Sequence, residues 1–246
     1  MLRKISPTKL ITASLALSLG LFICGLPTLS LAKFTPPAGR GLPGRREGAG
    51  TRGPCIKSSS PGKTVIALVP ETNLVSTYSE HPTFFWYLPA NNANKVEFVL
   101  ADKDDTELYK ATLSITGEPG VISISLPRSA TLSPLSVNEL YKWKFALICS
   151  EGDPSANVRT NGWVQREKLS DDLRKKLEQA TPLDRLAIYT SEGIWQESIR
   201  TLADLRRANP KDTNIEAAWM KLLQEVGLHN LAKEPILKIS SELPSN

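Results

Sequence analysis

The chain has 246 residues, 41% hydrophobic and 22% charged, which is typical of a globular protein and excludes a disordered, collagen-like or multi-span membrane chain. Two His and three Cys leave too few ligands for a His-rich or Cys-rich metal site. Residues 1–57 carry nine basic residues and one acid, a net charge of +8, so the +5 chain leaves −3 on the remainder. Because the excess positive charge lies in residues 1–57 and not on the rest of the chain, no nucleic-acid partner is expected.

Residues 1–32 predict a secretory signal peptide. Arg3, Lys4 and Lys9 precede an apolar run over 10–26, and the small residues Ser30 and Ala32 favour cleavage after Ala32. An uncleaved anchor and a lipoprotein acylated at Cys24 are the open alternatives. Cleavage predicts a periplasmic or extracellular protein with no membrane span after the signal is removed.

Two cysteines, Cys55 and Cys149, remain after that cleavage. An even pair in an exported protein favours a disulfide, because the compartment is oxidising. Two unpaired thiols are the alternative.

Residues 33–63 form an arm rich in Gly, Pro, Arg and Ser, a composition that cannot bury a core. Its glycines let successive amides converge on an anion, and Arg45, Arg46 and Arg52 add positive charge. These three arginines are therefore possible contacts for an anion or partner, and an acidic envelope polymer is a possible ligand. The alternative is a structural strap whose glycines let it lie close against the fold.

Residues 64–167 predict a β-sandwich of the immunoglobulin-like or fibronectin-like kind. The segment alternates short apolar or aromatic runs with turn residues at sandwich spacing. Tyr141 follows Leu135 by six residues, as in a tyrosine corner, where the hydroxyl bonds back to upstream backbone; an ordinary strand tyrosine is equally compatible. The predicted strands are 65–69, 83–88, 96–100, 108–115, 121–126, 141–147 and 158–166.

Residues 168–233 switch to helical periodicity and predict a small α-helical module, so the fold class is α+β. Tyr189, Ser198 and Leu202 fall at three preferred positions of a tetratricopeptide unit, although Pro182 stands where its early Trp is expected. A plain helical hairpin bundle fits as well. Because residues 167–168 leave almost no linker, the module is expected to pack on the sandwich. Residues 234–246 are expected to form a C-terminal tail.

Six stretches lie along the chain in the order 46–55, 82–87, 141–149, 162–166, 193–195 and 226–228. Together, in this order, they resemble an uncharacterised family of exported cyanobacterial proteins, a domain of unknown function. The resemblance covers roughly residues 45–230, and Ala49 interrupts the glycine run associated with the arm. The family supplies no known activity, so the resemblance implies context and no mechanism.

No catalytic residue, cofactor or metal ligand is predicted from motifs. The acidic cluster at Asp102, Asp104, Asp105 and Glu107 is interpreted as a solvated turn, because the glycine of a calcium loop is missing. The five tryptophans could form a carbohydrate platform, but four of them lie in core-like patterns, so packing is the favoured role.

The leading hypothesis is an exported, non-enzymatic interaction or scaffold protein of the cell envelope. Its helical module would dock an envelope protein, because helical hairpin units commonly take a peptide or a partner helix. The alternatives are a cell-wall or glycan hydrolase with an unrecognised carboxylate pair, which needs facing carboxylates in a cleft, and a carbohydrate-binding module, which needs coplanar exposed aromatics.

Overall fold

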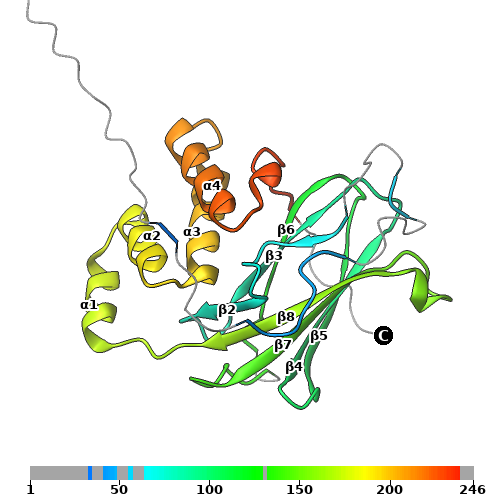
Figure 1. Cartoon of the computed structure of the whole chain (residues 1–246), viewed down its shortest axis with the longest axis horizontal. Coiled ribbons are helices and arrows are strands. Elements are labelled where there is room, and N and C mark those ends of the chain that lie inside the picture. The colour runs from blue at the N-terminus through cyan, green and yellow to red at the C-terminus, as the bar shows by residue number, and fades with distance from the viewer. Residues whose placement is uncertain (1–32, 35–40, 49–54, 58–63, 130–131, 239–246) are drawn as a thin grey trace, which may run out of the picture.

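The computed structural model describes residues 33–34, 41–48, 55–57, 64–129 and 132–238. Over these ranges the fold is mixed α/β, with two sheets of eight strands in total and four α-helices. The helices gather on one side of the sheets (Figure 1). None of the described helices is long and apolar enough to cross a membrane. The predicted signal peptide, Cys24 and Arg52 lie outside the described residues.

The strands form a three-stranded and a five-stranded sheet. The first has the antiparallel order β1-β3-β6. The second has the order β2-β8-β7-β4-β5, in which β2 runs parallel to β8 and the other pairs are antiparallel. Seven strands match the predicted set, and β2 was not predicted. The bounds are β1 Ile66–Ala67, β2 Leu74–Thr77, β3 Thr83–Leu88, β4 Lys95–Asp102, β5 Glu107–Ser114, β6 Gly120–Ser125, β7 Leu140–Leu147 and β8 Val158–Arg166.

An aromatic core lies between the two sheets. Trp86 on β3 stacks on Phe145 of β7 with ring centroids 4.4 Å apart, and meets Trp143 edge-on at 5.9 Å. Trp143 and Phe145 are separated by one residue on β7, so their side chains lie on the same face of the sheet. Burial of Trp86, Trp143, Trp195 and Trp219 confirms the packing role predicted for four of the five tryptophans.

Of the two alternatives left open for Tyr141, the structure contains the backward hydrogen bond. The Ser136 backbone N–H donates to the Tyr141 hydroxyl oxygen at 2.8 Å. This bond fixes the loop that leads into β7.

Four helices follow β8, and their ends match local capping signals. Ser170 and Thr181 cap α1 and α2 through their side chains, and Gly193 and Gly227 take left-handed φ values of 70° and 74° just beyond α2 and α4. The bounds are α1 Asp171–Gln179, α2 Pro182–Ser191, α3 Trp195–Ala208 and α4 Thr213–Glu225.

The helices pack on the sheets through α3. Trp195, at the start of α3, is fully buried, and its indole N–H donates to the Leu68 carbonyl just after β1 at 2.7 Å. Phe34, also buried, meets the Trp195 ring edge-on at 5.0 Å. The buried side chains of sheets and helices form one continuous cluster, which confirms that the module packs on the sheets. Only Leu177 of α1 is buried, so α1 projects from the body (Figure 1).

The first residues of the predicted tail join the three-stranded sheet. Ile236 forms a parallel bridge with Val121 at the start of β6, through Val121 N–H to Pro235 O at 2.7 Å and Leu237 N–H to Val121 O at 2.8 Å. The tail therefore covers one end of an exposed sheet edge.

Candidate functional site

The predicted disulfide is present between Cys55 and Cys149, which lie 94 residues apart in sequence. Cys149 follows β7 of the five-stranded sheet. Next to Cys55, Ile56 pairs with Asn91 in the loop after β3 of the other sheet. Residues 55–57 of the arm are thus fastened to both sheets.

A second described part of the arm, residues 41–48, closes the edge between the two sheets. Arg45 pairs with Asn161 of β8 through two backbone hydrogen bonds of 2.9 Å, and Glu47 pairs with Ile66 of β1. Gly48 lies so close to β8 that an added Cβ would stand 2.4 Å from Val158 Cγ1. These contacts are those of a structural strap, the second of the two roles considered for the arm.

Arg45 and Arg46 have opposite environments, because successive side chains of an extended backbone point to opposite faces. Arg46 points inward: its side chain is 12% exposed and its guanidinium donates to Val226 O at 2.8 Å and Val69 O at 3.3 Å. Val226 ends α4, where unpaired carbonyls attract a cation. Arg46 therefore ties the strap to the helices, and its charge faces the interior and not a ligand.

Arg45 instead faces solvent beside the outer face of β8. A shallow hollow of about 390 Å³ is lined by Arg45, Arg159 and Asn161. It adjoins a second hollow of about 320 Å³ over β7 and β8, since Pro43 and Asn161 line both. We call the two together the basic hollow; its charged residues are Arg45, Arg159, Lys142, Lys144 and Asp105.

A second candidate site surrounds Glu197 in the first turn of α3. Its Oε1 accepts hydrogen bonds from Thr77 Oγ1 at 2.6 Å and from the backbone N–H groups of Ser79 at 3.0 Å and Tyr78 at 3.2 Å. Its Oε2 is enclosed and has no hydrogen-bond partner among the described residues. Through Oε1 the Glu197 carboxylate connects β2 to α3, while Oε2 is left as an unused hydrogen-bond acceptor.

Burial controls the electrostatics around Glu197. Loss of hydration raises the pKa of its carboxyl, and the hydrogen bonds from Thr77, Ser79 and Tyr78 only partly oppose this. Burial, together with the carboxylates of Glu192 and Glu197, raises the pKa of Tyr78 to about 12. Perturbed groups of this kind cluster at functional sites, although structural networks produce them as well.

Glu197 also lines a groove of about 470 Å³ between α2 and α3. Tyr189 also lines the groove: burial raises the pKa of its hydroxyl, Glu197 raises it further, and Arg185 and Arg200 act in the opposite direction. Glu197, Arg185 and Arg200 all line the same groove as Tyr189. We call this the α2–α3 groove; it is lined by Pro182, Arg185, Tyr189, Glu197, Arg200, Thr201, Asp204, Leu205 and Ala208.

Replacing Glu197 by Gln is expected to change the pH dependence of stability. The pKa of Glu197 in the folded state lies above the usual value of 4.5. The protonated carboxyl therefore contributes its full stability to the fold below the pKa of the unfolded state. This contribution is lost as pH rises through the pKa of the folded state. Each pH unit crossed between the two costs about 1.4 kcal/mol. Urea denaturation at a series of pH values should show wild type losing stability relative to Glu197→Gln as pH rises. Parallel curves for the two proteins would contradict the buried, protonatable state.

The acidic cluster predicted to be a solvated turn is one in the structure. Asp102 Oδ1 accepts the backbone N–H groups of Asp104 and Thr106, each at 2.9 Å, and the bond from Thr106 is the main cause of the lowered pKa of Asp102. No group of three or more His, Cys, Asp or Glu side chains suited to a metal ion occurs in the described part of the chain.

Comparisons with known proteins identify the family of this chain. A search of curated proteins gave no match. The apo structure of Bacteroides uniformis β-glucuronidase 3 is similar at 12% identity over 70% of this chain, with a TM-score of 0.26, and the match spans 26% of that protein; a likeness this weak carries no argument. A family model described as Domain of Unknown Function (DUF928) matches residues 47–236. Because this match covers most of the chain, the protein belongs to the DUF928 family.

Proposed function

We propose that the protein is an exported, non-enzymatic interaction or scaffold protein of a cyanobacterial cell envelope, and that a segment of an envelope protein docks in the α2–α3 groove. In this proposal the two facing sheets are an immunoglobulin-like or fibronectin-like sandwich, and α2–α3 is a tetratricopeptide-like hairpin. The Tyr141 hydrogen bond supports the first assignment. Burial of Ser198 and Leu202 on α3 supports the second.

The observation that carries the docking proposal is the mixed lining of the α2–α3 groove. Pro182, Leu205 and Ala208 offer apolar contact, while the exposed Arg185 and Arg200 offer guanidinium groups. Arg200 is paired with Asp204 of the same groove at 3.7 Å. Arg185 is held in place because its Nε donates to Leu177 O at 2.8 Å. Apolar surface with ordered arginines is a common composition for a protein-binding site.

The same groove is less suited to hydrolysis. Its two carboxylates already have protein partners: Glu197 Oε1 accepts from Thr77, Tyr78 and Ser79, and Asp204 is paired with Arg200 at 3.7 Å and Arg207 at 3.1 Å. Glycoside hydrolases need two carboxyl groups that both face the scissile bond. A carbohydrate platform is also less favoured, since four of the tryptophans are buried.

Charge reversal in the groove tests the docking proposal. The tagged mature protein is recovered from a native envelope fraction as wild type, as Arg185→Glu/Arg200→Glu, and as the control Lys211→Glu on the exposed turn after α3. We expect at least a tenfold loss of one discrete partner with the groove variant alone, because an opposed charge replaces each arginine. An unchanged partner set in the groove variant would contradict the proposal.

Export with cleavage after Ala32 is the second part of the proposal. The Cys55–Cys149 disulfide supports it, because such bonds persist in oxidising compartments. Phe34, two residues beyond the proposed cleavage point, is buried against Trp195, and its backbone N–H donates to Glu225 Oε2 at 2.8 Å. N-terminal sequencing of the protein from its host should begin at Lys33, and an intact Met1 on the mature protein would contradict the proposal.

A further inference from the structure

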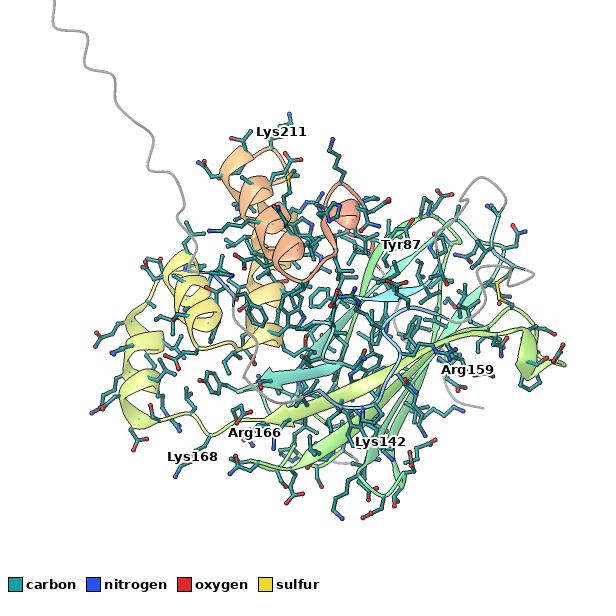
Figure 2. The ribbon with its side chains drawn as sticks, in the orientation of Figure 1. Tyr87, Lys142, Arg159, Arg166, Lys168 and Lys211 are labelled. Atoms are coloured by element: carbon teal, nitrogen blue, oxygen red, sulfur yellow. A yellow bond between two sulfur atoms is a disulfide. The ribbon has the colours of Figure 1, made fainter. Side chains whose placement is uncertain are left out.

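The basic hollow concentrates positive charge on a body that is otherwise slightly acidic. Arg45, Arg159, Lys142 and Lys144 supply four positive charges against the single carboxylate of Asp105, whereas residues 58–246 together carry a net charge of −3. Figure 2 shows Lys142 on β7 and Arg159 on β8, well away from the helices. The hollow is therefore a separate surface from the α2–α3 groove.

The lysines and the arginines of the basic hollow differ in their ion pairing. Lys142 and Lys144 both contact Asp105, the second at 3.1 Å, and their hydrogen bonds lower the pKa of that carboxyl. Arg45 and Arg159 are exposed and have no ion-pair partner within the described ranges. Two guanidinium groups are thus available for an oxyanion, and guanidinium binds carboxylate through two parallel hydrogen bonds.

The strap holds the hollow in shape. The Trp163 indole N–H donates to Pro43 O at 2.8 Å, and Asn161 Oδ1 accepts the Arg45 backbone N–H at 2.7 Å. Arg45 is fixed at its backbone, so binding would order only its side chain, which lowers the entropic cost of binding. The Trp163 ring is half-buried and carries Lys142 Nζ 5.0 Å from its centroid, which leaves an aromatic and cationic surface beside the arginines.

We propose that the basic hollow binds an acidic polysaccharide that carries carboxylate groups, with Arg45 and Arg159 as the carboxylate contacts. An aromatic ring, an amide and several cations in an open hollow suit sugar rings with spaced charges. A duplex nucleic acid is less suited, because it is bound by positive charge spread along a face, whereas the positive charge here is confined to one hollow.

Polygalacturonate fragments serve as the probe, titrated calorimetrically into the full mature protein at low salt. We expect binding that weakens at least tenfold in Arg45→Gln/Arg159→Gln and that falls as salt rises. The matched control, Arg174→Gln/Lys211→Gln, removes two exposed cations from the helical module and should bind as wild type does. The strap contacts of Arg45 come from its backbone, so the melting temperature should not change.

Any one of several results would overturn the proposal. They are an equal loss of binding in the control variant, equal binding of the fully methyl-esterified polymer, which lacks the charges, and binding of double-stranded DNA as tight as that of polygalacturonate. Absence of any binding by wild type at low salt would also overturn it. None of these results bears on the α2–α3 groove, which lies elsewhere on the molecule.

Discussion

Loss of the Cys55–Cys149 disulfide is expected to lower the free energy of unfolding by about 4–5 kcal/mol, because the bond closes a long loop and restricts the unfolded chain. The two cysteines lie 94 residues apart, and the loop includes most of both sheets. Urea denaturation of Cys55→Ala/Cys149→Ala should match that of wild type with reductant. Labelling of both thiols in untreated wild type would contradict the bond in solution.

The same variant should loosen one end of the arm and not the other. Lys57 is held beside the disulfide by its N–H bond to Ala90 O, whereas Arg46 is held independently by Val69 O and Val226 O. Limited trypsin digestion should therefore cut the variant after Lys57 while Arg46 stays protected. Simultaneous cleavage at both residues would mean that the disulfide, and not the strap contacts, holds residues 41–48.

Gly162→Ala is expected to destabilise the fold by about 3 kcal/mol, at the upper end of the usual cost of overpacking. An added Cβ would lie 2.4 Å from Trp143 Cζ2 and 2.8 Å from the Asn73 backbone oxygen. Trp143 is fully buried against Trp86 and Phe84, and the Asn73 oxygen accepts the Trp163 N–H at 2.8 Å. Neither neighbour can move without breaking the core or the β2–β8 pairing.

Gly152→Ala is the matched control for this prediction, since nothing lies within 4 Å of its added Cβ. Urea denaturation followed by tryptophan fluorescence should show a large loss for Gly162→Ala and little change for Gly152→Ala. Equal stability of the two variants would show that the close approach of β8 to Trp143 is wrong.

Elements with strong local signals could be predicted from the sequence. Strand β3 matches the predicted range 83–88 because its aromatic run is bounded by Pro82 and Pro89. Helices α1 and α2 begin where Ser170 and Thr181 indicate. Strand β2 could not be predicted, because its four residues carry no alternating pattern and its pairing with β8 is parallel and distant in sequence.

The candidate sites depended on contacts that a sequence does not display. Arg45 and Arg46 are adjacent and alike in sequence, and only the pairing of the arm with β8 decides which faces solvent. Glu197 is a polar residue in the first turn of an amphipathic helix, where exposure is the usual outcome. Its burial follows from the Thr77–Ser79 turn that packs on it.

Site-specific photo-crosslinking in the native envelope tests the docking function most directly. A benzophenone amino acid replaces Thr201, which lines the α2–α3 groove, or Lys211 on the exposed turn after α3. We expect one discrete crosslinked protein at position 201 that is absent at position 211 and disappears when Arg185→Glu is added. The same adducts at both positions, or none at position 201, would contradict partner docking in this groove.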